Sequence, residues 1–307
     1  MNFVFDVMII ITCLAGLWVG AYWIVEGSIS IARKIGISEL VIGLTIVSIG
    51  TSAPEFAVSI LSALKGHGNI SVGNVVGSNI FNLGFILGGV ALVHPIKTSG
   101  TIVKRDGSVL VLATFLLLLL FMDLCLAFWE GALLICLLVA YILYLFSSRQ
   151  TVSEEISAGS FRWYTPLMLL IGLAVILLSS HFLVDSASSV ARAFGVSEWV
   201  IGVTIVAMAT STPELVTSLV AVLRGHPGIS AGNLIGSDIF NLLGVLGVAG
   251  TIQSITVSPE AYGSLFLLCG MVIIVVVMMR TGWQVSRIEG GVLVCMGMVR
   301  WIMDFTK

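Results

Sequence analysis

The chain has very little charge. Asp, Glu, Lys and Arg together make up 10% of its 307 residues, whereas hydrophobic residues make up 58%, and the mean hydropathy is +1.13. A soluble globular domain carries about 25% charged residues, so this composition excludes a soluble fold and indicates an integral membrane protein whose first partner is the lipid bilayer. The net charge of −2 argues against nucleic acid as a partner.

Sequence signals for redox, metal–thiolate and enzymatic chemistry are also missing. The five cysteines all lie in apolar runs, without a Cys-x-x-Cys pair or a histidine at ligand spacing, so we interpret them as small buried apolar residues. The first residues, MNFVFD, contain no basic stretch, which argues against a cleaved signal peptide. No nucleophile–base set or cofactor motif is recognisable, so neither an enzyme nor a cofactor is expected.

Long apolar stretches predict ten transmembrane helices. A helix needs about 20 mostly apolar residues to cross a bilayer. Ten stretches qualify: 3–32, 39–64, 70–95, 106–123, 125–147, 164–191, 198–223, 229–253, 261–280 and 288–304. We therefore expect an all-α membrane protein with a first five-helix repeat at 1–147, a linker at 148–162 and a second five-helix repeat at 163–307.

The distribution of lysine and arginine predicts the orientation. Ten of the 14 basic residues lie in the linker or at the other loops and helix ends on the linker's side of the membrane, and four lie on the opposite side. Basic residues favour the cytoplasm. The linker should therefore be cytoplasmic, and both termini should be extracellular, in a protein of the cell membrane.

One segment occurs twice. Residues 36–91 and 195–250 align without a gap at an offset of 159, and about half of their positions are identical. Because each repeat has an odd number of helices, five, the second copy enters the membrane from the side opposite to the first. The result is an inverted repeat with a pseudo-two-fold axis in the membrane plane. Such a repeat can build one central site with two symmetry-related access routes.

The repeated segment carries a carboxylate inside the membrane. Glu55 and Glu214 lie in stretches apolar enough to span a bilayer, where an idle ionisable residue is rare. Each follows a proline, Pro54 or Pro213, which should break the helix and free backbone carbonyls for a protein, water or ion partner. The neighbouring hydroxyls are repeated too: Thr51 and Ser52 in the first copy, Thr210 and Ser211 in the second.

The second half of each copy adds neutral oxygens. It reads GNVVGSNIFN at 73–82 and GNLIGSDIFN at 232–241. Residues four apart share a helix face, which pairs Ser78 with Asn82 and Ser237 with Asn241. Oxygen-only sites suit hard cations such as Ca²⁺ and Na⁺. The glycines of these motifs, Gly73, Gly77, Gly232 and Gly236, are expected to let helices approach closely.

Charge arithmetic favours antiport. One Ca²⁺ neutralises two carboxylates, and an empty site would hold both charges in a low dielectric at high cost. A proton or a monovalent cation should then replace Ca²⁺. The residues alone leave both coupling ions open, and they also leave a cation channel as a less favoured alternative, because a channel needs no paired access routes.

Three polar positions are harder to interpret. Asp238 replaces Asn79 of the first copy and, about 100° around the helix from Ser237, is either a third ligand or a group that supports the ligands. Glu26 and Asp185 are equivalent positions near the ends of their helices. A solvated helix end is the simpler interpretation for them, and the lining of an access path is the alternative.

GTSAPE at 50–55 and ATSTPE at 209–214, each followed by its second motif, resemble the two repeats of the sodium/calcium exchanger family, within the calcium/cation antiporter superfamily. The short linker resembles that of prokaryotic members. The resemblance implies Na⁺/Ca²⁺ antiport without a cofactor, in which the first and sixth helices slide across a rigid core. Neutral Asn241 argues against potassium coupling. The implied cation ligands are Thr51, Ser52, Glu55, Ser78, Asn82, Thr210, Ser211, Glu214, Ser237 and Asn241.

Overall fold

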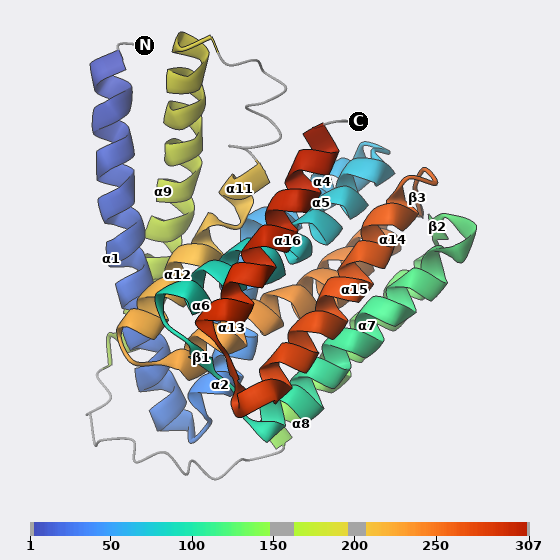
Figure 1. Cartoon of the computed structure of the whole chain (residues 1–307), viewed down its shortest axis with the longest axis horizontal. Coiled ribbons are helices and arrows are strands. Elements are labelled where there is room, and N and C mark those ends of the chain that lie inside the picture. Colours follow the sequence, from blue (N-terminus) through green and yellow to red (C-terminus); the bar gives the residue numbers. More distant parts are fainter. Residues whose placement is uncertain (1–2, 148–162, 196–206, 306–307) are drawn as a thin grey trace.

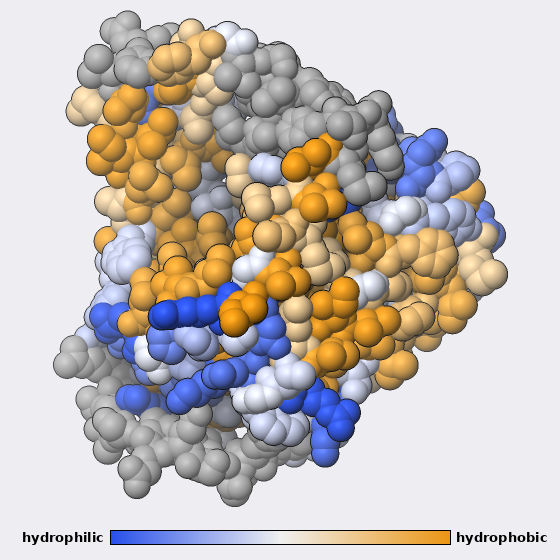
Figure 2. Space-filling view, viewed as in Figure 1, coloured by the Kyte–Doolittle hydropathy of each residue, from blue (hydrophilic) through white to orange (hydrophobic). Residues whose placement is uncertain are grey.

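The computed structural model describes residues 3–147, 163–195 and 207–305. They form a bundle of long apolar helices (Figure 1). Hydrophobic residues cover the middle of the visible face, and hydrophilic ones gather toward its lower edge and its upper right corner (Figure 2). Seven helices of the described part are long and apolar enough to cross a membrane, or eight when the bent pair Glu39–Thr51 and Ala53–Leu64 is one span. The predicted helical membrane class is confirmed.

Helices fill the first half of the chain. They are α1 (Phe3–Ile35), α2 (Glu39–Ile42), η1 (Gly43–Val47), α3 (Ser48–Thr51), α4 (Ala53–Leu64), α5 (Gly68–Phe81), η2 (Asn82–Leu87), α6 (Gly88–Val93), η3 (Ile102–Gly107), α7 (Ser108–Leu120), η4 (Phe121–Asp123) and α8 (Phe128–Ser147). The segments η1, η2 and η3 are single π-helical turns inside longer helices.

The second half repeats this order. Its helices are α9 (Thr165–Ala193), α11 (Ala207–Thr210), α12 (Thr212–Leu223), α13 (Pro227–Ile239), the π-turn η6 (Phe240–Val245), α14 (Leu246–Ile252), α15 (Ala261–Arg280), η7 (Thr281–Trp283) and α16 (Arg287–Phe305). Most of each predicted span is helical where the structure describes it, although the predicted span 125–147 begins in strand β2 and its helix starts only at Phe128. The predicted linker 148–162 and the start of the predicted span 198–223 lie outside the described residues.

Four short strands were not predicted. β1 (Ile96–Lys97) pairs antiparallel with β4 (Gln284–Val285), and β2 (Cys125–Leu126) pairs with β3 (Ile255–Thr256). The offset of 159 converts β1 into β3 and β2 into β4, so the two ladders are equivalent under the repeat. They lie at different ends of the bundle, β1 toward the bottom and β2 and β3 at the upper right (Figure 1).

The helix ends also obey the repeat. Gly36 and Gly195 follow α1 and α9 with φ of +75° and +78°, and Gly66 and Gly225 follow α4 and α12 with φ of +74° and +81°. Glycine accepts this left-handed conformation without a side-chain clash, which is why it closes helices. The two halves therefore share their backbone turns as well as their motifs.

The expected close approach at glycines holds in only one repeat. A Cβ built on Gly232 or Gly236 would lie within 3 Å of backbone atoms around Leu40 and Leu44. The prediction is wrong for Gly73 and Gly77, which have nothing within 4 Å of such a Cβ. Both line a cavity instead, so the same motif packs tightly in one half of the molecule and loosely in the other.

Candidate functional site

Two broken helices form the centre of the site. The predicted break near Pro54 is confirmed: α3 ends at Thr51, α4 begins at Ala53, and the helix bends by 50° there. Ser52, between them, has a ψ of 11° instead of the helical value. Ser211 separates α11 from α12 with a ψ of 6°. Each proline lies in the first turn of the new helix, where its missing N–H is not needed.

The two breaks face each other across the repeats. Ser52 Oγ donates to Glu214 Oε1 at 2.9 Å, and its equivalent Ser211 Oγ donates to Glu55 Oε1 at 3.0 Å. Both carboxylates are fully buried. Each lies in the first turn of its helix, where the partial positive charge of the helix N-terminus favours an anion. The glutamates that the sequence places 159 residues apart thus share one polar centre.

Amides form a second layer beside the carboxylates. Asn82 Nδ2 donates to Asp238 Oδ1 at 3.0 Å, and its equivalent Asn241 Nδ2 donates to Asn79 Oδ1 at 3.0 Å. Asn79 Nδ2 also donates to the backbone oxygen of Asp238 at 3.0 Å. Asn82 begins the π-turn η2 and Asn241 lies in η6, and π-turns are frequent at functional sites. The replacement of Asn79 by Asp238 between the repeats therefore lies inside this layer.

Two further asparagines donate hydrogen bonds to the backbone oxygens of the two glutamates. Asn74 Nδ2 donates to Glu55 O at 3.2 Å, and Asn233 Nδ2 donates to Glu214 O at 3.4 Å. Thr51 Oγ1 donates to Asn233 Oδ1 at 3.1 Å. Sequence reasoning missed these two asparagines and Asn79, although their repetition within the Gly-Asn and Gly-Ser-Asn/Asp motifs was a usable signal.

Several buried acceptor oxygens in the site have no hydrogen-bond partner within the described residues. They are Glu55 Oε2, Glu214 Oε2, Asp238 Oδ2, Asn82 Oδ1 and Asn241 Oδ1. Buried polar atoms are nearly always hydrogen-bonded, so a group of exceptions needs an explanation. All five atoms are acceptors, and none of the ion pairs formed by the described residues involves these side chains. Such a set suits a cation.

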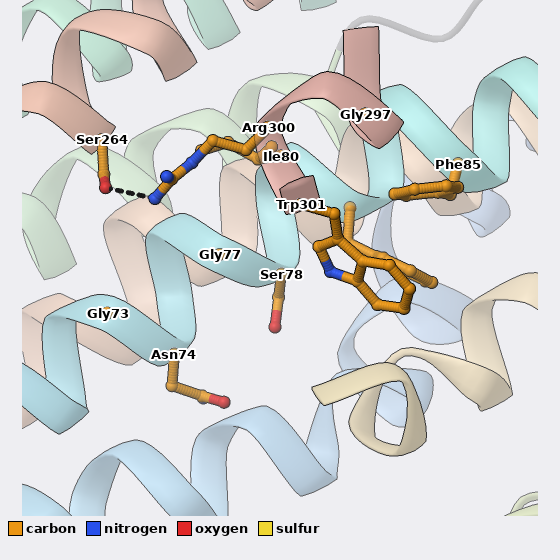
Figure 3. Close-up of a pocket in the computed structure, with 11 residues that line it drawn as sticks. Gly73, Asn74, Gly77, Ser78, Ile80, Phe85, Ser264, Gly297, Arg300 and Trp301 are labelled. Atoms are coloured by element: carbon orange, nitrogen blue, oxygen red, sulfur yellow. Dashed lines mark hydrogen bonds between the residues drawn. The ribbon is translucent and has the colours of Figure 1, made fainter. Parts of the chain in front are cut away.

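The remaining predicted ligands lie around these groups. Ser237 Oγ donates to Glu214 Oε1 at 3.5 Å, whereas its equivalent Ser78 lines a cavity of about 270 Å³ together with Asn74. Figure 3 shows Asn74 and Ser78 on the same side of α5, away from the hydrogen bond between Arg300 and Ser264. Thr210, half-buried, ends α11 directly before the break.

The carboxylates do not form a three-membered metal cluster. Within the described residues, no group of three or more His, Cys, Asp and Glu side chains is arranged to hold a metal ion. Asp238 differs from the two glutamates in its partner, because it accepts its hydrogen bond from Asn82 and not from a serine of the opposite repeat. The site is a pair of carboxylates surrounded by neutral oxygens, a composition that binds hard cations.

Comparison with known proteins gives one family. The profile of the sodium/calcium exchanger protein family matches residues 5–147 and 164–296. CaxA of Alkalimonas amylolytica is 37% identical over 88% of this chain and 89% of its own length. The sodium/calcium exchanger MaX1 of Methanosarcina acetivorans is 31% identical over 93% of this chain and 94% of its own length.

A solved structure shows the same fold. The sodium-calcium exchanger NCX_Mj, soaked without Na⁺ and Ca²⁺, superposes with a TM-score of 0.86 and 28% identity, over 97% of this chain and 98% of its own. A second structure of that exchanger, soaked with 100 mM Na⁺ and 10 mM Sr²⁺, matches with a TM-score of 0.86 and 29% identity.

Proposed function

Because the chain belongs to the sodium/calcium exchanger protein family, we propose that it exchanges Ca²⁺ for Na⁺ across the cell membrane by alternating access to one site between Glu55 and Glu214. Family membership makes it a membrane transporter rather than an enzyme. The relatives MaX1 and NCX_Mj are named as exchangers of these two ions, and their similarity over nearly the whole chain supports the same cargo here.

The proposed architecture is ten helices in two inverted repeats, 1–147 and 163–307, joined by a cytoplasmic linker at 148–162. Its support is the pairwise equivalence of contacts under the 159-residue offset: the crossed serine–glutamate bonds, the asparagine layer and the two strand ladders at different ends of the bundle. The bias of Lys and Arg toward the linker side supports extracellular termini.

One observation carries the site assignment. Glu55, Glu214, Asn82 and Asn241 each present a buried oxygen acceptor without a hydrogen-bond partner among the described residues. A dehydrated cation supplies the missing partner, and carboxylate and amide oxygens are the ligands that Ca²⁺ and Na⁺ prefer. The full proposed ligand set is Thr51, Ser52, Glu55, Ser78, Asn82, Thr210, Ser211, Glu214, Ser237 and Asn241.

The exchange follows from charge balance. Ca²⁺ neutralises Glu55 and Glu214 in a region where two bare carboxylates are expensive. Na⁺ ions that enter from the other side replace it at the same oxygens, so the two cargoes exclude each other. Because each glutamate is bonded to a serine of the opposite repeat, movement of one half changes the surroundings of both carboxylates.

We assign Asp238 a supporting role. It accepts a hydrogen bond from the Asn82 amide, and no three carboxylates of the described residues are arranged together to hold a metal ion. It orients the Asn82 amide so that its oxygen can face the ion. In this proposal two carboxylates, Glu55 and Glu214, neutralise the charge of the bound cation, and Asp238 does not contribute as a ligand.

Equilibrium binding tests the site directly. Purified protein in detergent should bind radiolabelled Ca²⁺, Na⁺ should displace it competitively, and Glu214→Gln should remove the binding. Potassium at the same concentration is the matched control and should leave the Ca²⁺ bound. Binding that survives Glu214→Gln would place the Ca²⁺ site elsewhere.

A further inference from the structure

A contact far from the ion site ties α1 to α12. Arg224, directly after α12, donates through Nη2 to Glu26 Oε1 on α1 at 2.6 Å. Its guanidinium also lies 4.3 Å from the centre of the Tyr22 ring, on the same face of α1. Glu214 lies in the first turn of α12, ten residues before Arg224, so the contact connects α1 with a helix that carries a carboxylate of the proposed ion site.

The repeat predicts a mirrored contact at the opposite end of the molecule. The offset of 159 converts Arg224 into Lys65, Glu26 into Asp185, and Tyr22 into His181. Within the described residues no ion pair joins Lys65 to Asp185. Asp185 instead lies 3.6 Å from His181, and their side chains are 61% and 69% exposed.

Helix packing shows the same asymmetry. α1 packs along α12, but the equivalent pair, α9 and α4, hardly touches. In Figure 1 the upper parts of α1 and α9 stand together and apart from α4 and α5. The molecule is thus closed around Arg224 and open around Lys65. Two halves with equivalent motifs are in different states.

We propose that Glu26, Tyr22 and Arg224 form a latch that holds one access route closed, and that Lys65 and Asp185 form the mirrored latch when the routes exchange. The proposal rests on alternating access, the function proposed above. In an inverted repeat, the second end state arises when the halves exchange conformations. A contact made in one state and broken in the other shifts the balance between them.

The two latches should differ in strength. Arginine presents a planar fork that fits a carboxylate and stacks on an aromatic ring, whereas lysine is a point charge. Tyrosine is a good cation–π partner, and its equivalent here is histidine. The Arg224 latch should therefore favour the present state, and its removal should raise the population of the other state by about three- to tenfold.

Distance measurement between spin labels can detect this shift. The labels are placed at Leu64→Cys on α4 and Phe182→Cys on α9, both more than half exposed, after replacement of the five native cysteines. In lipid nanodiscs the unmodified latch should give mainly the long distance. Glu26→Gln should add a short-distance population, and the swap Glu26→Arg with Arg224→Glu should remove it again.

The mirrored pair supplies the control. Asp185→Asn should leave the long distance dominant, because its latch is open in this state. An identical distance distribution for Glu26→Gln and the unmodified latch would overturn the proposal, as would a failure of the charge swap to reverse the shift. The labelled protein with an intact latch should also change its distances when Ca²⁺ or Na⁺ is added. If it does not, the proposal of alternating access is wrong, and the latch proposal, which rests on it, is wrong as well.

Discussion

At the scale of single residues, the proposed function depends on Glu55 and Glu214, because in the proposed site each supplies half of the charge that faces a divalent ion. Both are fully buried, and each accepts one hydrogen bond from a serine of the other repeat. Glutamine keeps the shape and that hydrogen bond but loses the charge. The loss of a charged contact in a buried site costs about 2–3 kcal/mol or more. We therefore expect Glu55→Gln and Glu214→Gln each to reduce Ca²⁺ exchange about 100-fold or more.

Radiolabelled Ca²⁺ flux in proteoliposomes measures this effect, and the elution profile in detergent reports whether the variants fold. Asp123→Asn, an exposed carboxylate in the turn after α7, is the matched control and should transport normally. Near-normal flux in either glutamate variant would refute the site assignment.

Asp238 provides a second residue-scale prediction. Its Oδ1 accepts from Asn82 at 3.0 Å, and an asparagine oxygen can accept the same bond. Asp238→Asn makes the second repeat match the first, so Ca²⁺ transport should persist, with a change of apparent affinity of less than about tenfold. Concentration-dependent Ca²⁺ flux checks this. Complete loss of flux in a folded variant would instead make Asp238 a direct ligand.

The sequence predicted the carboxylates because an ionisable residue in an apolar stretch is visible without any knowledge of the fold. It did not predict the roles of Asn74, Asn79 and Asn233. Asn79 meets its partners Asp238 and Asn241 across the repeat boundary, and spacing along one helix cannot show which face meets a distant segment. The repeated asparagines marked the positions but not the contacts.

At the scale of helices, the repeats differ in packing although their motifs match. A Cβ on Gly236 would lie 2.7 Å from the backbone oxygen of Leu44, whereas one on Gly77, its equivalent, meets nothing within 4 Å. Gly236→Ala must push α13 away from η1, and overpacking of this kind costs about 1–3 kcal/mol. Gly77→Ala should be neutral or slightly stabilising, because alanine favours helix.

Thermal unfolding in detergent, followed by circular dichroism, compares the two alanine variants directly. A lower midpoint for Gly236→Ala than for Gly77→Ala is expected. Equal midpoints would mean that α13 and η1 are not in the close contact described here.

The helix break could be predicted because proline leaves a clear chemical signal, and the bend of 50° lies where Pro54 required it. The π-turns η2 and η6 could not, since an extra residue in a helical turn has no characteristic side chain. The two-residue strands also leave no recognisable pattern in the sequence. They form because loops of different repeats meet, which is a consequence of the fold.

At the scale of the whole molecule, the duplicated sequence predicts two equivalent halves, and the structure shows them in different states. Matching sequences cannot indicate which end is closed. That choice is visible only in tertiary contacts such as the ion pair between Glu26 and Arg224 and the exposure of Asp185. In the proposed mechanism, a site shared between two halves that exchange states allows one cargo to leave as the other enters.

The central claim is that Na⁺ and Ca²⁺ exchange at this site. Its most direct test is radiolabelled Ca²⁺ uptake into proteoliposomes with an imposed ion gradient. The proposed ligands that accompany the carboxylates are hydroxyl and amide oxygens, which can replace the water around Na⁺ but neither take up nor release protons near neutral pH. An outward Na⁺ gradient should therefore drive Ca²⁺ uptake, and a pH gradient without Na⁺ should not. Uptake driven by the pH gradient alone, with none driven by Na⁺, would contradict the account and make protons the coupling ion.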